Sequence, residues 1–266
     1  MKLLLYGSTG FLATKIIRQA LSNPSITSLI AIGRRPLPTP DFPDIDTTKL
    51  ESFVVDFDSP TPYDSDPVLQ QHIKTADACI WTIAITPAHM NSVPWEQVER
   101  VCHDYTVEFV RYLVGVNEKL LGGKDKFRFV YVSGHNAARP KEKKPFILGE
   151  YCMLRGKTES EVLELLKGGE VCVARPGIIE GGGKETGLFK GMFFWMIGLP
   201  NVRVEEVAGA VLEGVMKGFG EVEGKGKEKR GKDGDGGWLW RNEDLVRIGE
   251  GVVGKRMREK TTSVMV

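Results

Sequence analysis

The sequence is poor in the residue types that build metal sites and disulfide frameworks. It has four cysteines and four histidines in 266 residues. The cysteines are widely spaced without a C-x-x-C pair, and the histidines form no H-E-x-x-H pattern. These absences argue against a zinc site and against a fold stapled by disulfides. We therefore expect no metal, and thiols that are buried or incidental.

Net charge and long apolar runs are lacking as well. The 36 basic and 35 acidic residues leave a net charge of +1, which gives no electrostatic reason to expect nucleic acid or an anionic membrane as a partner. The leucines after Lys2 form a run too short for a signal sequence. The most apolar segment, 188–199, contains Lys190 and two glycines and is not typical of a membrane span. We expect a cytoplasmic protein that binds a small-molecule substrate, either alone or as a homodimer.

What the sequence does contain is a strand–glycine–helix motif at its start. The apolar run 2–6 meets Gly7-Ser-Thr-Gly10, and apolar residues at helical spacing follow from Phe11. Gly7 allows a tight reversal, Gly10 lets backbone N–H groups approach a phosphate, and Ala13 permits close packing of helix on strand. The unpaired N–H groups and the dipole of a helix N-terminus favour an anion there. The motif predicts a dinucleotide site made by Gly7, Ser8, Thr9, Gly10, Phe11 and Leu12.

Strand-like and helix-like segments alternate along most of the chain. Strands are expected at 2–6, 28–32, 52–56, 76–83, 126–132 and 170–174, and later helices at 67–75, 95–116, 155–167 and 204–217. This alternation predicts an α/β fold with a doubly wound parallel sheet, which is a Rossmann fold.

The organisation of the chain is expected to change after Gly177. We predict that residues 1–177 form a dinucleotide-binding core, and that 178–266 form a small C-terminal substrate lobe packed on it as one structural unit. Glycine and mixed charges dominate 218–237, which is expected to be a flexible surface excursion. The lobe also holds an aromatic cluster: Phe189, Phe193, Phe194 and Trp195. This cluster could line an apolar pocket, pack as core or make a dimer contact.

The end of the second predicted strand bears on the choice of cofactor. An enzyme that uses NAD needs a carboxylate there to accept hydrogen bonds from the adenosine ribose. This chain has Gly33-Arg34-Arg35 instead. Two guanidiniums suit a 2′-phosphate, because their planar forks match phosphate oxygens. We therefore predict NADP(H) as the cofactor; the other interpretation is a pair of solvated arginines before a proline-rich loop.

Together these features resemble the short-chain dehydrogenase/reductase superfamily, in its extended or atypical branch, over about residues 1–210. The matching features are Gly7-x-x-Gly10-x-x-Ala13, Asp56 after the third strand, Thr82 to Ala84 after the fourth, Ser133 after the fifth, and Arg175-Pro-Gly177. The resemblance implies that Thr82 borders the cofactor, that Asp56 contacts the adenine, and that Ser133 orients a substrate carbonyl. Asp56 could equally be a turn residue at the strand end.

Active members of that superfamily carry Y-x-x-x-K on the helix after the fifth strand. The lysine lowers the tyrosine pKa and holds the nicotinamide ribose, and the tyrosine moves a proton. By resemblance, Lys157 is the lysine and Met153 stands at the tyrosine position. Tyr151 precedes Lys157 by six residues, which places two side chains on nearly opposite faces of a helix. Three interpretations stay open: Tyr151 acts through an irregular turn, the proton comes from elsewhere or is not needed, or redox chemistry is lost.

The remaining polar candidates surround these positions. His135 and Asn136 follow Ser133 and could donate protons or hydrogen bonds, or be structural. Glu159 and Glu161 are expected on the solvated face of the predicted helix. The sequence predicts an NADP(H)-dependent oxidoreductase for a small apolar or aromatic carbonyl or imine compound. The alternatives are a catalytically quiet NADP(H)-binding regulatory protein and a cofactor-bound cyclase or isomerase.

Overall fold

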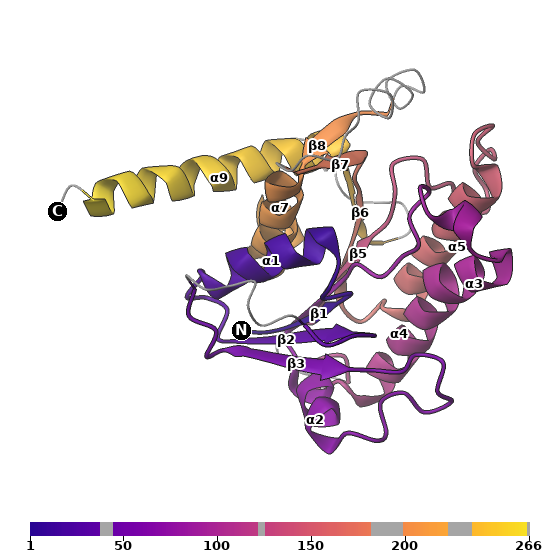
Figure 1. Cartoon of the computed structure of the whole chain (residues 1–266), viewed down its shortest axis with the longest axis horizontal. Coiled ribbons are helices and arrows are strands. Elements are labelled where there is room, and N and C mark those ends of the chain that lie inside the picture. Colours follow the sequence, from indigo (N-terminus) through magenta and orange to yellow (C-terminus); the bar gives the residue numbers. More distant parts are fainter. Residues whose placement is uncertain (38–44, 122–125, 182–198, 223–235, 265–266) are drawn as a thin grey trace.

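Seven parallel strands form one sheet in the computed structural model, which describes residues 1–37, 45–121, 126–181, 199–222 and 236–264, with side chains up to 254 (Figure 1). Their spatial order is β3-β2-β1-β4-β5-β6-β9. The strands are β1 (Lys2–Tyr6), β2 (Ser28–Gly33), β3 (Leu50–Val54), β4 (Ala78–Trp81), β5 (Arg128–Val132), β6 (Glu170–Arg175) and β9 (Trp238–Arg241). Every neighbouring pair is parallel. The structure confirms the predicted α/β Rossmann fold.

Helices cover both faces of this sheet. They are α1 (Phe11–Leu21), α2 (Pro67–Thr75), α3 (Trp95–Glu99), α4 (Tyr105–Val116), α5 (Gly149–Leu165), α7 (Val204–Lys217), α8 (Phe219–Val222) and α9 (Asn242–Val264). One face carries α1, α7 and α9, and the other carries α2, α4 and α5 (Figure 1). A second, two-stranded parallel sheet joins β7 (Ile178–Glu180) to β8 (Asn201–Arg203).

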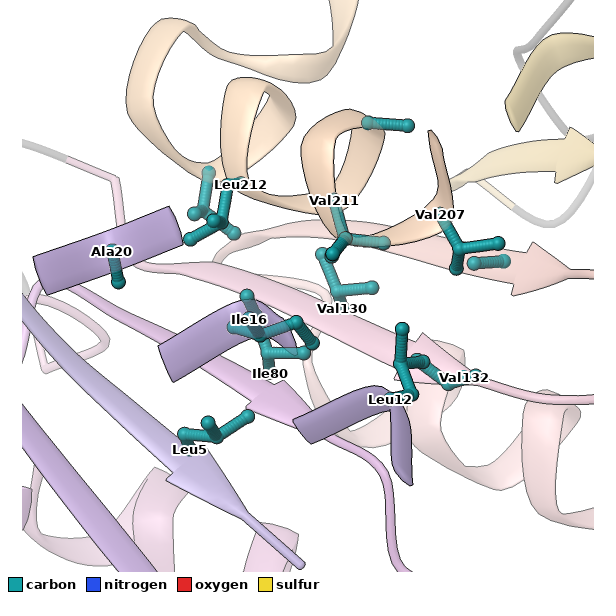
Figure 2. Packing of buried hydrophobic residues seen from close by; sticks show 14 of the residues in the cluster. Leu5, Leu12, Ile16, Ala20, Ile80, Val130, Val132, Val207, Val211 and Leu212 are labelled. Carbon is teal, nitrogen blue, oxygen red and sulfur yellow. The ribbon is translucent and has the colours of Figure 1, made fainter. Parts of the chain in front are cut away.

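Successive strand residues point into two different cores. In β1, Leu5 joins the core under α1 and α7, whereas Tyr6 joins the core under α2, α4 and α5. Figure 2 shows the first core, where Ile16 of α1 and Val211 of α7 pack beside Val130 of β5. Because both of their faces are buried, the central strands β1, β2, β4 and β5 are apolar at nearly every position, which is why they can be recognised in the sequence.

Residues beyond 177 also contribute to the main sheet, because β9 pairs with β6 and α7 packs on α1. The predicted division of the chain at 177 stays a prediction. Within the predicted excursion 218–237, α8 occupies Phe219–Val222. Residues 223–235 and the predicted aromatic cluster at 189–195 lie outside the described residues.

The predicted helix 95–116 is interrupted. Between α3 and α4, residues Arg100–Asp104 form a π-helical turn. The backbone carbonyl of Cys102 in this turn accepts hydrogen bonds from the hydroxyls of Thr158, at 3.2 Å, and Tyr131, at 3.4 Å. A π turn holds one residue more than an α turn, and apolar spacing does not reveal it. The turn connects α3 and α4 to both β5 and α5.

Helix α5 begins six residues earlier than predicted, at Gly149 instead of Arg155. Its buried face includes Thr158 and Glu159, so the apolar periodicity that marks a helix is weak there. Leu148, just before the helix, has φ +54° and is the one non-glycine residue with positive φ in the described ranges. The early start places Tyr151 inside the first turn of a regular helix.

The described ranges contain neither a candidate membrane span nor a cluster of metal ligands. No helix there combines the length and apolarity that a membrane span requires. No group of three or more His, Cys, Asp or Glu side chains is arranged to hold a metal ion.

Candidate functional site

The loop after β1 has the geometry of a phosphate cradle. Gly7 has φ +84°, and a Cβ there would lie 2.5 Å from the hydroxyl oxygen of Thr82, so only glycine fits. The N–H of Gly10 donates to the Gly7 carbonyl at 2.8 Å. Gly10 is the N-cap of α1 and offers the first-turn amides no side chain, and that turn has no acidic residue. An anion at this point would therefore meet uncapped amides and the positive end of the helix dipole.

Two predicted residues lie under this loop, where β1 and β4 part. The Thr82 hydroxyl donates to the Tyr6 carbonyl at 2.7 Å and so joins the ends of the two strands. The Ser8 hydroxyl is buried and has no hydrogen-bond partner among the described residues. A Cβ on Gly33 would lie 2.8 Å from it, so glycine ends β2 beside the loop. Side chains larger than glycine at positions 7 and 33 would therefore clash with Thr82 and Ser8, which restricts the conformation of the loop.

The other predicted loop residues differ in what they can offer. Phe11 is 58% exposed at the start of α1, and Thr9 is half-buried. Leu12 is buried in the core, so only its backbone N–H can serve a ligand. The loop thus offers mainly backbone donors, as a phosphate site requires.

Arg34 and Arg35 follow β2 and are exposed, as free cations for a phosphate would be. Asp56 is also exposed, and its carboxylate accepts the N–H of Asp58 at 3.1 Å in a turn after β3. The pKa of Asp58 is lowered by the Tyr105 hydroxyl, which donates to it at 2.7 Å, with a smaller contribution from Arg34. The turn role of Asp56 is therefore present in the structure, and its contact with adenine stays a prediction.

Tyr151 and Arg155 lie one turn apart on the buried face of α5. Tyr151 is 8% exposed, and its hydroxyl donates to the Ile85 carbonyl, just past β4, at 2.9 Å. Arg155 is 2% exposed, and its Nη2 donates to the carbonyl of Val132, the last residue of β5, at 2.6 Å. The carbon of its guanidinium lies 4.8 Å from the ring centre of Tyr131. Spacing of i, i+4 thus brings a phenol and a cation to the carboxyl ends of β4 and β5.

Several buried polar groups at these strand ends lack a partner. Ser133 follows β5 directly, and its N–H donates to the Ala174 carbonyl at 2.8 Å. Its hydroxyl is buried and unpaired within the described ranges, as are Nε and Nη1 of Arg155. Most buried polar groups in proteins are hydrogen-bonded. These unpaired groups therefore indicate a place where a ligand supplies the missing partners.

The structure corrects the expectation for Lys157. Its side chain is 55% exposed, and its Nζ lies 3.8 Å from the Glu161 carboxylate on the outer side of α5. Tyr151 is buried on the inner side of the helix, and Met153, four residues before Lys157, is half-buried. Arg155, which sequence reasoning missed, lies where a cation can act on Tyr151. The signal for it was available, since Tyr151 and Arg155 read as Y-x-x-x-R.

Glu159 is fully buried, so the expectation that it is solvated was wrong. Its carboxylate accepts hydrogen bonds from Nη2 of Arg175 at 2.6 Å, Nε of Arg175 at 2.9 Å and Nε of Arg139 at 3.1 Å. Gly156 permits this close approach, because a Cβ there would lie 1.9 Å from the Ala138 carbonyl oxygen. The ion cluster ties α5 to the end of β6 and to the β5–α5 segment. It therefore fixes the inward face of the helix.

The pKa values of two site residues follow from burial. Burial raises the pKa of Tyr151, and nearby Arg155 offsets part of this rise. The phenol is therefore neutral at pH 7. Burial also lowers the pKa of the half-buried His135, so that imidazole is neutral at pH 7 too. Asn136 is exposed beside it.

No protein-family model matches the chain, and no curated protein sequence matches it. Solved structures do match. MoeE5 in complex with UDP-glucuronic acid and NAD has a TM-score of 0.60 at 15% identity, covering 96% of this chain and 83% of that one. WbmH from Bordetella bronchiseptica, in complex with NAD+, has a TM-score of 0.59 at 15% identity, covering 90% and 74%. Vestitone reductase from alfalfa has a TM-score of 0.55 at 20% identity, covering 80% and 72%.

These likenesses define the class of fold. The chain is a Rossmann-fold α/β protein, built like a plant reductase and like two proteins solved with NAD. At 15–20% identity, the likeness establishes the fold alone.

Proposed function

We propose that the chain is an NADP(H)-dependent oxidoreductase of the extended or atypical short-chain dehydrogenase/reductase type. Its substrate is a small apolar or aromatic carbonyl or imine compound. One observation carries the proposal: buried Tyr151 and Arg155 donate to carbonyls at the carboxyl ends of β4 and β5, and Ser133, whose hydroxyl is unpaired in the described part of the chain, directly follows the residue that Arg155 bonds. The strand order reverses between β1 and β4, and open α/β sheets bind ligands at that point.

The residues present fit a nicotinamide dinucleotide. The uncapped amides after Gly7 would hold the pyrophosphate, and Arg34 with Arg35 would hold the 2′-phosphate. The unpaired Nε and Nη1 of Arg155 would bond the hydroxyls of the nicotinamide ribose. The bound nicotinamide supplies the hydride. The NAD complexes of MoeE5 and WbmH support this class of cofactor for the shared fold.

Three side chains would then act in the reduction of the substrate. The Ser133 hydroxyl donates a hydrogen bond to the carbonyl oxygen and orients it. The neutral phenol of Tyr151 transfers its proton to that oxygen. Arg155 stabilises the phenolate that is left, and solvent returns the proton. A raised pKa of Tyr151 makes the phenol a donor rather than a base at pH 7, so the site favours reduction.

The surroundings of Tyr151 support an apolar substrate. Val98, Cys102 and Leu154 form a small core cluster with it. Partly buried apolar residues pack against that cluster: Ala84, Ile85, Met90, Val93 and Trp95. A substrate bonded to Tyr151 would have this apolar surface beside it, which favours an aromatic or aliphatic body over a sugar.

Cofactor binding is the first test. NADPH and NADH are titrated into the purified protein while nicotinamide fluorescence is recorded. We expect NADPH to bind more tightly. The double variant Arg34→Ala, Arg35→Ala should lose roughly tenfold or more of that affinity, since each charge-assisted bond contributes about 1.5–3 kcal/mol. Arg111→Ala, an exposed arginine on α4, is the matched control and should change nothing. Equal binding of both cofactors contradicts the NADP(H) preference, and binding of neither contradicts the oxidoreductase.

The reaction itself is tested by NADPH oxidation with a panel of aromatic aldehydes, ketones and cyclic imines. Tyr151→Phe should lower kcat by about a hundredfold or more, as loss of a general acid does. Tyr112→Phe, a half-buried tyrosine on α4, is the control. Undiminished turnover by Tyr151→Phe would remove the tyrosine from the mechanism.

The pH profile tests the acid more specifically. Because the phenol must be protonated, the rate of reduction should be level at low pH and fall as pH rises through the pKa of Tyr151, above its usual value of 10. Arg155→Met removes the cation that holds this pKa down, so the alkaline limb should move to higher pH. Arg155→Lys should keep the limb near its original position. A limb that moves to lower pH in Arg155→Met would refute the assigned roles.

A further inference from the structure

The segment between β5 and α5 carries an exposed apolar tip. Phe146 is 104% exposed, Ile147 43% and Leu148 39%. Other large apolar residues are exposed singly in the described ranges, and no other two of them are adjacent in sequence. Three consecutive exposed apolar side chains form a patch, and such patches mark interaction sites more often than scattered residues do.

The backbone of this tip is held in an unusual conformation. Leu148 has φ +54° and ψ +33°, in the left-handed region that leucine avoids. Its carbonyl accepts the N–H of Cys152 in the first turn of α5 at 2.9 Å, so the conformation is fixed by the helix start. An apolar residue kept in a strained conformation at the surface indicates a constraint other than packing.

Lysines precede the tip, and among the described residues two of them are not neutralised by a nearby acid. Lys141, Lys143 and Lys144 precede Phe146 within six residues. The single acid among them, Glu142, is half exposed but already engaged: its carboxylate accepts the backbone N–H of Arg139 at 2.6 Å and lies 3.9 Å from Nη2 of Arg175. Lys144 pairs with Glu150. Lys141 and Lys143 have no acidic partner within the described ranges.

The tip also borders the candidate site. A pocket of about 440 Å³ is lined by Asn136, Lys143, Phe146 and Ile147, among others. The N–H of Ala138, another lining residue, donates to the Cys152 carbonyl next to Tyr151. The pocket beside the tip is therefore joined by a backbone hydrogen bond to the first turn of α5, which carries Tyr151.

We infer that residues 141–148 dock the protein on an anionic phospholipid surface, with Phe146 inserted among the acyl chains and Lys141 and Lys143 on the headgroups. An exposed apolar tip with lysines beside it fits a fluid anionic interface, into which an apolar side chain can insert without a preformed complementary surface. The net charge of +1 conceals this local cluster. Docking would bring the site to a membrane in which an apolar substrate dissolves. That last consequence rests on the proposed function; the docking does not.

The test is sedimentation of the full chain with phosphatidylcholine vesicles, with and without phosphatidylserine. We expect binding to the vesicles with phosphatidylserine, weakened by salt. Phe146→Glu should lower the partition coefficient roughly tenfold or more. Lys141→Glu and Lys143→Glu should each lower it by about fivefold or more, since one basic residue near the surface contributes about 1 kcal/mol. Val68→Glu is the matched control: Val68 is 56% exposed on α2 and should not matter.

Several outcomes would overturn the inference. They are failure of the wild type to sediment with either vesicle, wild-type binding by Phe146→Glu, and an equal loss in Val68→Glu. A dimer that Phe146→Glu converts to a monomer would assign the tip to a second copy of the chain instead. The readout requires neither cofactor nor turnover. Vesicle binding without NADPH binding would therefore refute the proposed function and leave the docking intact.

Discussion

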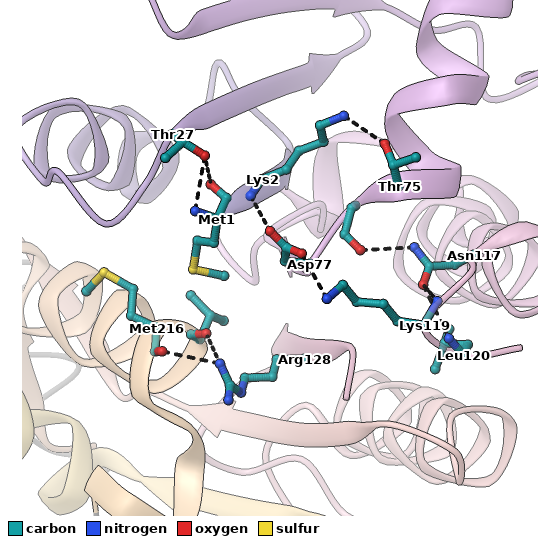
Figure 3. A network of polar contacts seen from close by, with 12 residues as sticks. Met1, Lys2, Thr27, Thr75, Asp77, Asn117, Lys119, Leu120, Arg128 and Met216 are labelled. Carbon is teal, nitrogen blue, oxygen red and sulfur yellow. Dashed lines mark hydrogen bonds and ion pairs between the residues drawn. The ribbon is translucent and has the colours of Figure 1, made fainter. Parts of the chain in front are cut away.

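Polar groups at the two ends of the parallel sheet differ in whether they have hydrogen-bond partners. At the amino ends, Asp77 joins β1 to the segment after α4: its carboxylate accepts the backbone N–H of Lys2 at 2.5 Å and lies 3.1 Å from Nζ of Lys119 (Figure 3). Asn117 donates to the carbonyl of Ile73 at 2.8 Å. None of these polar side chains has a buried atom without a partner.

At the carboxyl ends, in contrast, Ser8, Ser133 and Arg155 each keep a buried donor unpaired within the described ranges. Core aromatics such as Tyr6 and Trp81 also carry an unpaired atom, but ring packing accounts for their burial. A hydroxyl or guanidinium has no such reason to be buried. The comparison teaches that the polar side chains named at the amino ends are satisfied by the protein itself, whereas those at the carboxyl ends keep donors that the proposed ligand would satisfy.

The ion cluster under the site should give the largest effect on stability. Glu159→Gln removes the buried carboxylate charge to which Arg175 and Arg139 donate, so the free energy of unfolding in urea should fall by about 3–5 kcal/mol. The control Glu161→Gln alters a partly exposed carboxylate and should cost less than about 1 kcal/mol. Similar losses in both variants would show that the ion cluster of Glu159 does not stabilise the protein more than a surface ion pair does. The carboxyl ends would then lack a stable polar cluster beneath their unpaired donors.

At the amino ends, Asp77→Ala should cost stability without affecting the site. It removes the acceptor for Lys2 and the partner of Lys119, and the free energy of unfolding should fall by about 1.5–3 kcal/mol. Affinity for NADPH, measured on the same preparation below the unfolding transition, should stay unchanged. A parallel loss of affinity would break the comparison, because the two ends would then act as one unit.

Gly156→Ala tests how closely α5 must approach the β5–α5 segment. The new Cβ meets backbone at Ala138, so we expect a loss of roughly 1–3 kcal/mol in unfolding free energy. Gly115→Ala on α4 adds a Cβ in open space and should stabilise by about 0.5–1 kcal/mol. Thermal unfolding of both variants checks the sign of each change. If both substitutions changed the unfolding free energy in the same direction, the backbone near Ala138 would have moved to make room for the new Cβ at position 156.

The smallest effect on stability should come from Ser133→Ala. Its hydroxyl has no partner to lose, so the free energy of unfolding should stay within about 0.5 kcal/mol of wild type or rise slightly. Thr158→Val removes a hydroxyl bonded at 2.9 Å and 3.2 Å and should cost about 1 kcal/mol. If Ser133→Ala cost as much as Thr158→Val, the hydroxyl of Ser133 would have a structural partner.

The parts of the molecule predictable from sequence are those determined by neighbouring residues. Gly7 and Gly10 lie between a buried strand and an amphipathic helix, and that order alone predicts the fold and the phosphate cradle. Tyr151 was a candidate from the sequence, but its pairing with Arg155 was not predicted, for a physical reason. The helix that carries them buries polar residues such as Glu159, so the apolar period was weak and the helix start was placed too late. A pattern fixed on lysine then drew attention to Lys157.

The π-helical turn at Arg100–Asp104 has a consequence for the evolution of this chain. One additional residue changes the phase of a helix by about 100°. The turn therefore sets the rotation of α3 relative to α4, and it places the Cys102 carbonyl where the hydroxyls of Thr158 and Tyr131 reach it. Deleting one residue from it would rotate everything before it relative to everything after it. Insertions and deletions should accordingly be tolerated in the surface loops and selected against at these five positions.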